Sequence, residues 1–157
     1  METTIHFRET QQLRQPWLWG LLGLSALVAL ANLARGKHSS RETARQFLGL
    51  GAAALLLRVA RLSTEVRDDE VYVRFAPFHR SFRKTPFADV TDVQATGYSP
   101  LRYGGWGIRW SPSGVAYTVS RQSGIRLARD GGRSVFVGSD DPDELLAAVQ
   151  EASEREV

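Results

Sequence analysis

Aromatic and arginine side chains gather in the second half of the sequence, where they could form a binding surface. Tyrosine and tryptophan anchor many interfaces, and the planar guanidinium group of arginine pairs with carboxylate or phosphate. Strand alternation places Arg109 and Trp110 on opposite faces, so these two side chains cannot share one site. We favour core packing over ligand contact for Trp106 or Trp110. The candidate ligand-contacting residues of this segment are Arg102, Tyr103, Trp106 and Arg109.

Three glycines in the same segment, Gly104, Gly105 and Gly107, raise the alternative of a phosphate-binding loop. A dinucleotide-binding fingerprint needs its glycines between a strand and a helix. Here the glycines lead into another predicted strand. We therefore predict a structural turn that lets the sheet bend.

A second group of basic residues lies between two predicted strands. Arg80, Arg83 and Lys84 follow His79 closely in the sequence. Arginine and lysine side chains could hold an anionic ligand at this position. The alternative, which we favour, is a solvated basic edge that prevents strand pairing with another chain.

The sequence offers no further pattern for catalysis or metal binding. Cysteine is absent, which excludes disulfides and thiolate chemistry. The three histidines are far apart in sequence, and most carboxylates fall in predicted turns or at a helix cap. No nucleophile-elbow motif occurs. We expect a protein that is not an enzyme and needs no cofactor or metal.

The charge balance also bears on the class of partner. The chain has 20 basic and 17 acidic residues, a net charge of +3. A small positive surplus suits an anionic membrane surface. Nucleic-acid binding would need a basic patch with interleaved aromatic residues or a known motif, so we do not predict it.

An uncharged, apolar run from Trp17 to Ala34 predicts a transmembrane helix. Its 18 residues correspond to about 27 Å of helix, close to the hydrocarbon thickness of a bilayer. Pro16 suits the first helical turn, and the two tryptophans suit the membrane interface. A buried core helix is one alternative. A signal peptide cleaved near Ala29–Ala31 is another.

A second apolar run, Phe47–Leu57, predicts that the chain returns through the membrane. Arg58 and Arg61 can snorkel, which extends the usable segment to Leu62. We expect a helical hairpin over residues 16–62, with spans at about 16–34 and 45–62, after a polar segment 1–15. Small-residue pairs could let its helices approach closely: Ser25 with Ala29, and Gly49 with Ala53.

The basic residues around this hairpin barely set its orientation. Four lie in the linker between the helices and five flank the hairpin, which slightly favours a cytoplasmic C-terminal domain in the plasma membrane. The linker residues are Arg35, Lys37, Arg41 and Arg45, and the flanking ones are Arg8, Arg14, Arg58, Arg61 and Arg67.

Residues 63–157 predict a β domain with one closing helix. About seven short strands alternate in hydrophobicity, and turn signals such as Asp68–Asp69 and Asp130–Gly131 separate them. Asp141 is a natural N-cap for an amphipathic helix over residues 142–154. Such a helix could plug the open end of a small antiparallel barrel.

The order of these elements resembles a family of prokaryotic membrane proteins with two helical spans and a bacterial pleckstrin-homology-like domain. The resemblance implies a seven-stranded barrel with a capping helix, and a domain whose basic loops hold lipid headgroups in some relatives of the fold. It implies no enzymatic activity. The residues that carry it are Thr64–Asp69, Pro77–His79, Tyr103–Arg109, Ala116, Tyr117, Val137–Ser139, Pro142 and Leu145.

The function expected from these features is a membrane-anchored binding or scaffolding module. Its partners would be the lipid bilayer and a protein or membrane-surface ligand. An accessory subunit of a membrane enzyme or transporter is one alternative, and a secreted β domain after signal cleavage is another.

Overall fold

The computed structural model describes residues 4–13, 15–97, 107–119 and 123–156. The chain divides into two compact units. Leu13–Ala60 form a helical hairpin, and Met1–Gln12 together with Arg61–Val157 form a β domain. The hairpin is therefore inserted into the chain of the β domain and does not simply precede it.

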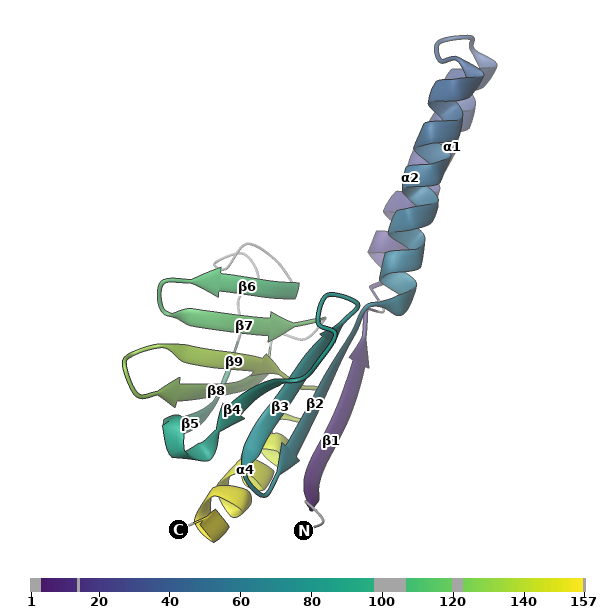
Figure 1. Ribbon diagram of the computed structural model, residues 1–157. Coiled ribbons are helices and arrows are strands. Elements are labelled where there is room, and N and C mark those ends of the chain that lie inside the picture. The colour runs from purple at the N-terminus through teal and green to yellow at the C-terminus, as the bar shows by residue number, and fades with distance from the viewer. Residues whose placement is uncertain (1–3, 14, 98–106, 120–122, 157) are drawn as a thin grey trace. The chain divides into compact units, whose positions relative to one another are not determined.

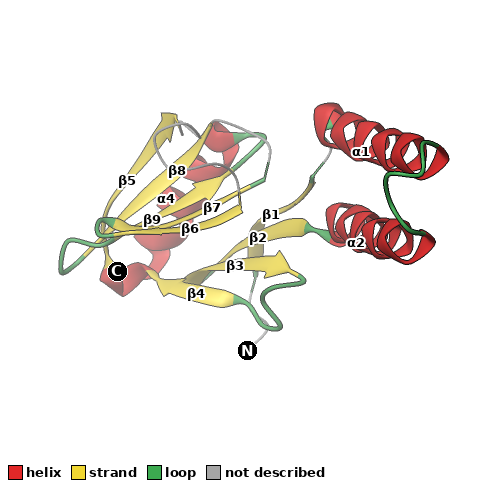
Figure 2. Cartoon of the chain, turned by 90° about the horizontal axis from the view of Figure 1, so that it is seen from above, coloured by secondary structure: helices red, strands yellow, loops and turns green. Residues whose placement is uncertain are grey.

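The hairpin consists of α1 (Pro16–Ala34) and α2 (Ser40–Val59), which pack side by side (Figure 2). Pro16 stands in the first turn of α1, as predicted. Ser39 begins α2 with a capping box, in which the Glu42 amide donates to Ser39 Oγ and the Ser39 amide donates to Glu42 Oε2. This cap explains why α2 starts five residues before the predicted boundary at residue 45.

Only α1 among the described helices is long and apolar enough to cross a membrane. Just 6 % of its most apolar window is buried, and Leu27 keeps 65 % of its surface exposed. The helix thus has the length and composition of a membrane anchor or a signal sequence. α2 carries Arg41, Glu42 and Arg45 in its first two turns and does not reach the same hydropathy.

The first sheet of the β domain contains four antiparallel strands in the order β1-β2-β3-β4 (Figure 1). Three of the strands follow α2, whereas β1 precedes α1 and pairs with β2 along its length. The alternation of apolar residues in β1 ends after Phe7, which is why the sequence showed only a polar segment there. The strands are β1 (Ile5–Gln12), β2 (Arg61–Arg67), β3 (Glu70–Ala76) and β4 (Arg83–Pro86).

The second sheet contains five strands in the order β5-β8-β9-β7-β6. A short 3-10 helix, η1 (Phe87–Asp89), leads into it. β7 and β9 run parallel, and the other described pairs are antiparallel. The strands are β5 (Val90–Gly97), β6 (Gly107–Ser111), β7 (Gly114–Thr118), β8 (Ser123–Arg129) and β9 (Ser134–Gly138).

The C-terminal helix α4 (Pro142–Glu156) packs against both sheets, on β1 and β2 of the first and on β5 and β8 of the second. Its apolar stripe of Leu145, Val149 and Ala152 is fully buried. The Glu144 amide donates to Asp141 Oδ1 at 3.2 Å, which confirms the predicted N-cap. Burial of this stripe joins the two sheets through one core.

The predicted closed barrel of seven strands is wrong. Nine strands are described, and their hydrogen bonds form two separate sheets. The chain leaves the first sheet after β4, passes through η1, and β5 then pairs with β8. Because no described pairing joins β4 to β5, the sheet does not close on itself. The architecture is an α+β domain of two sheets and a helix.

Candidate ligand-binding surfaces

The described residues of the predicted binding surface do not form one site. Arg80, Arg83 and Lys84 belong to the first sheet, at the β3–β4 connection, whereas Arg109 and Gly107 lie on β6 of the second sheet. Gly107 begins β6 with a φ of 104° and has open space around it. The remaining predicted residues, Arg102, Tyr103, Gly104, Gly105 and Trp106, fall outside the described part of the chain.

The β3–β4 loop, residues 77–82, is held against the domain by its central residues. The His79 amide donates to the Phe75 carbonyl at 2.8 Å. The ring of His79 stands edge-on to Tyr117 at 5.7 Å, and the rings of Phe75 and Phe78 are 5.8 Å apart. These contacts fix the backbone of the loop while its outer side chains face solvent.

Three side chains of this region point outward: one aromatic ring and two arginines that have no acidic partner among the described residues. Phe78 is 61 % exposed, and Arg80 and Arg83 are exposed with no ion pair or hydrogen bond among the described residues. Lys84 differs, because its Nζ lies 3.1 Å from Glu70 Oε2 and 5.0 Å from the Tyr72 ring centre. The hydrogen bond that Lys84 donates to Glu70 raises the pKa of Lys84. We therefore separate Lys84 from the two free arginines.

The charge of the loop also affects His79. Burial lowers the pKa of the His79 imidazole, and the nearby Arg83 guanidinium lowers it further. The neutral imidazole is thus the form that the folded domain favours. Its Nδ1 lies 3.4 Å from the Phe75 amide, a contact that needs an unprotonated acceptor nitrogen.

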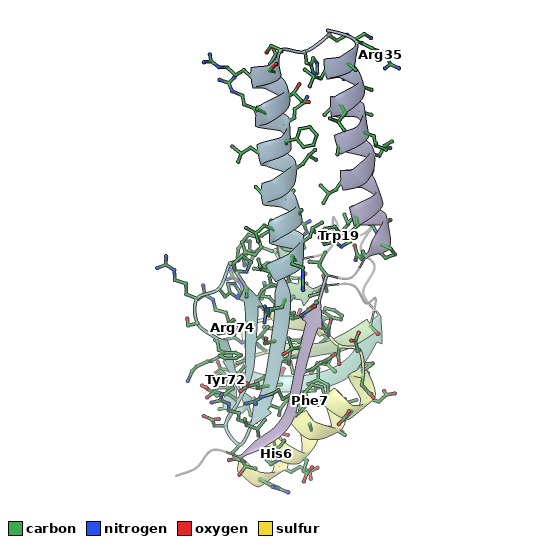
Figure 3. All side chains as sticks on the ribbon, turned by 90° about the vertical axis from the view of Figure 1, so that its right-hand side faces the viewer. His6, Phe7, Trp19, Arg35, Tyr72 and Arg74 are labelled. Carbon is green, nitrogen blue, oxygen red and sulfur yellow. The ribbon has the colours of Figure 1, made fainter. Side chains whose placement is uncertain are left out.

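Strand register shows which end of the first sheet carries this loop. Gln12 of β1 pairs with Arg61 of β2, and Arg61 pairs with Ala76 of β3. The chain enters α1 soon after Gln12 and leaves α2 just before Arg61. The loop therefore leaves the sheet at the end from which the chain runs into the hairpin. Figure 3 labels Arg74 on β3 and His6 on β1, which lie toward opposite ends of this sheet.

A second surface lies on one face of the other sheet. Register places one residue from each strand in a single row across it. Arg109 and Arg126 stand on either side of Ala116 and Phe136 in this row, and neither arginine has an ion pair or hydrogen bond among the described residues. The row is Gln94, Arg126, Phe136, Ala116 and Arg109.

A groove of about 380 Å³ follows this row. The β6–β7 turn borders it with Ser111 and Ser113, and Ser134 of β9 adds another hydroxyl group. The ring of Phe136 lies over Gly124, where a Cβ atom would come within 2.9 Å of the ring. We name this groove, with Arg109, Arg126, Phe136 and Ala116, the sheet groove.

Sequence reasoning found only one of the two sheet-groove arginines. Arg126 and Arg109 are brought to one face by the order β8-β9-β7-β6, which no local pattern reveals. The alternation within each strand was a usable signal, since Ile125 and Leu127 are fully buried and Arg126 between them must face outward.

The predicted core packing of Trp110 is wrong. Its side chain is 79 % exposed, the highest exposure among the large hydrophobic residues described. Trp110 stands on β6, an edge strand, and borders the sheet groove. Its side chain faces away from Arg109, as strand alternation predicts, and a tryptophan this exposed on an edge strand is typical of an interaction surface.

Within the described residues, no group of three histidine, cysteine, aspartate or glutamate side chains could hold a metal ion. The chemistry of the two surfaces is that of cations, hydroxyl groups and aromatic rings. Such groups bind anions and apolar segments.

A protein-family model matches residues 44–154, from the second turn of α2 to the last turn of α4, and its description is "Family of unknown function (DUF6141)". The chain belongs to the DUF6141 family. The matched DUF6141 region includes both the β3–β4 loop and the sheet groove, and leaves out β1 and α1. No protein of curated function matches the sequence.

Proposed function

We propose that this DUF6141 protein is a membrane-anchored binding module that presents its β domain at the membrane surface. The observation that carries the proposal is the exposed apolar helix α1, inserted between two strands that pair with each other. A helix with this much exposed leucine is stable in a lipid environment but not in water. We keep the pleckstrin-homology-like architecture in the proposal, because two sheets with a C-terminal helix across them are consistent with it.

The position of β1 argues against removal of α1 as a signal peptide. Cleavage near Ala31 would remove β1 from the first sheet. It would also remove Gln11, whose Nε2 donates to the Gly138 carbonyl at 2.9 Å in the core of the domain. Loss of this strand would leave β2 with an unpaired edge and α4 without part of its support. These contacts favour a retained anchor over a secreted domain.

Strand pairing also supports a second crossing. β1 lies before α1 and β2 lies after α2, yet the two strands belong to one sheet. If α1 crosses the bilayer, the chain must cross back before β2 can pair with β1. We assign the return to α2, with Arg41 and Arg45 near one headgroup layer and Arg58 near the other. Both spans of the sequence-based hypothesis are thus part of the proposal.

We propose the sheet groove as the binding surface for an acidic segment of a protein partner. Arg109 and Arg126 lie three strands apart, which corresponds to about 14 Å. An extended peptide that crosses the strands covers that distance with carboxylates about four residues apart. Phe136 and Ala116 would contact the residues between them. Carboxylates in such a segment would complement two arginines that have no acidic partner among the described residues.

Membrane extraction tests the anchor. The full chain should remain in the membrane pellet after a carbonate wash, and mass spectrometry of the mature protein should recover residues 1–12. Release of the intact chain by carbonate would overturn the proposal. A mature N-terminus near Asn32 would support secretion instead.

Photocrosslinking tests the sheet groove. A photoreactive amino acid in place of Ser111, which lines the groove on the same face of β6 as Arg109, should crosslink a partner in native membranes, and the product should weaken when Arg109→Gln and Arg126→Gln are combined. Ser113→Ala at the rim is the matched control, because it removes no charge. The crosslinked peptide identifies the partner, including any membrane enzyme or transporter that the chain serves. A crosslink that is indifferent to both arginines contradicts acidic recognition.

A further inference from the structure

We infer that the β3–β4 loop is a second membrane contact, in which Arg80 and Arg83 bind anionic lipid headgroups and Phe78 inserts between them. This inference rests on the proposed membrane anchor and adds to it a lipid class and the residues that recognise it. The occupant is the anionic leaflet from which the hairpin enters the membrane.

Connectivity brings the loop to the bilayer. One residue, Ala60, separates the end of α2 from β2, and Arg61 at the start of β2 pairs with Ala76 immediately before the loop. Paired strands are about 5 Å apart. If α2 ends at the headgroups, the loop begins within a few residues' length of the same layer.

Charge is distributed unevenly along the first sheet, with basic residues at the loop end and acidic residues at the opposite end, as contact with an anionic membrane requires. Residues 71–88 contain four arginine or lysine residues, one histidine and no aspartate or glutamate. The opposite end of the sheet carries Asp68, Asp69 and Glu70 in the β2–β3 turn and beside it. The arginines nearest that acidic end, Arg8 and Arg67, are already paired with Glu65. The free positive charge thus lies at the end that continues into the anchor.

The loop combines the two groups that membrane-surface segments use. Arg80 and Arg83 supply free guanidinium groups for phosphate oxygens. Phe78 supplies an aromatic ring that is 61 % exposed, although its neighbours Phe75 and His79 are held by the core. A fixed backbone that displays these side chains loses little entropy when it meets the headgroups.

The loop contact also bears on the orientation of the hairpin in the membrane. Counts of basic residues along the sequence favoured neither orientation strongly. Arg80 and Arg83 are distant from the helices in sequence but join the domain side of the hairpin through strand pairing. With them, the five flanking basic residues become seven, against four in the helix linker. Anionic lipid is concentrated in the cytoplasmic leaflet, so the loop places the β domain in the cytoplasm.

A single-cysteine label tests the inference, because the natural chain has no cysteine. The full chain with Phe78→Cys carries a fluorescent label and is reconstituted into phosphatidylcholine vesicles with or without phosphatidylserine. Nitroxide-bearing lipids should quench this label strongly when phosphatidylserine is present, and aqueous iodide should quench it weakly. Asp69→Cys, at the other end of β3 and about 20 Å away, should show the reverse pattern.

Charge variants measure how much each arginine contributes to the lipid contact. Arg80→Gln and Arg83→Gln should each lower the ratio of lipid-contacting to free label about fivefold, the effect of one basic residue at an anionic surface. Lys84→Gln is the matched control and should change the ratio little, because Glu70 already pairs with Lys84. Inorganic phosphate should compete no better than chloride at equal ionic strength. Stronger competition would assign the site to free phosphate and overturn the inference.

Two outcomes distinguish failure of the loop contact from failure of the proposed membrane anchor. If the label at position 78 is as open to iodide as the label at position 69, while the chain resists carbonate, the loop contact is wrong and the anchor stands. If carbonate releases the chain, the proposed function itself fails. A label at Ser81→Cys, with Phe78 intact, repeats the measurement should Phe78→Cys misfold.

Discussion

Glu9 links the first strand of the protein to the start of its last helix. Its carboxylate accepts hydrogen bonds from Ser139 Oγ at 2.6 Å and from the Asp140 amide at 2.7 Å. Ser139 Oγ in turn accepts from the Asp141 amide at 3.0 Å, next to the N-cap of α4. A residue that precedes the hairpin thus orients a helix that begins more than a hundred residues later.

Replacing Glu9 should destabilise the domain. Glu9→Ala leaves the buried Ser139 hydroxyl and the Asp140 amide without this acceptor, which should lower the free energy of unfolding by about 1–3 kcal/mol. Urea unfolding of the detergent-solubilised chain, followed by tryptophan fluorescence, measures the change. Thr10→Ala on the exposed neighbouring position should cost much less. Equal losses for the two variants would show that the carboxylate contacts matter little.

His79 should make stability depend on pH. Because burial and Arg83 lower its pKa in the folded state, the unfolded chain binds a proton more readily. The contribution is fully present above about pH 6.5, the usual value for histidine, and is lost as the pH falls through the folded-state pKa. His79→Gln should flatten this part of the stability profile. In NMR titrations, Arg83→Gln should move the His79 pKa upward, and a fall would contradict the assigned cause.

At the scale of elements, the parallel contact between β7 and β9 depends on Gly114. Its φ is 143°, and a Cβ atom there would lie 1.8 Å from the carbonyl oxygen of Ser134, its partner in the ladder. No side chain fits without movement of one strand. The β6–β7 turn and the rim of the sheet groove therefore rely on a glycine at this position.

Alanine at Gly114 should destabilise the second sheet. We expect Gly114→Ala to lower the free energy of unfolding by about 2–4 kcal/mol, from backbone strain and overpacking together. Gly131→Ala is the matched control, since its φ is also positive at 84° but no atom lies within 4 Å. It should cost about 1–2 kcal/mol, the strain of the backbone alone. Equal effects in thermal or urea unfolding would mean that the close approach to Ser134 relaxes easily.

For the whole molecule, the insertion of a hairpin between two paired strands would couple the proposed membrane anchoring to folding of the β domain. The sheet needs β1 and β2 on one side of any membrane that the hairpin enters. If α1 crosses the membrane, α2 must therefore cross it too, although α2 is less apolar than α1. In the proposed anchoring, the β domain therefore requires a second crossing, which we assign to α2.

Arginine substitutions test that coupling. Leu27→Arg in α1 and Leu48→Arg in α2 replace leucines that are 65 % and 76 % exposed in the hairpin. A charge near the centre of a span costs about 2.5–3.5 kcal/mol in insertion, so each variant should lower the carbonate-resistant fraction. Leu27→Phe and Leu48→Phe, which keep both helices apolar, should not. If only Leu27→Arg lowers the fraction, α2 does not cross the bilayer core.

The sequence by itself determined the elements with strong local signals. The uncharged run at Pro16–Ala34, the alternation in β2 and β3, and the Asp141 cap of α4 are local, and each appears at its predicted place. The helix α2 begins before its apolar run, because the capping box of Ser39 and Glu42 starts it among charged residues. The exposed Trp110 was misassigned because burial depends on neighbours that lie far away in sequence.

Only the tertiary structure decided how distant segments meet. It made the polar N-terminal segment the edge strand of a sheet, replaced a closed barrel by two sheets, and brought Arg126 into line with Arg109. It also divided the predicted binding residues between two surfaces, one beside the chain's entry to the hairpin and one on the second sheet. The physical reason is that strand pairing and side-chain burial are interactions between residues far apart in the chain, which local periodicity does not encode.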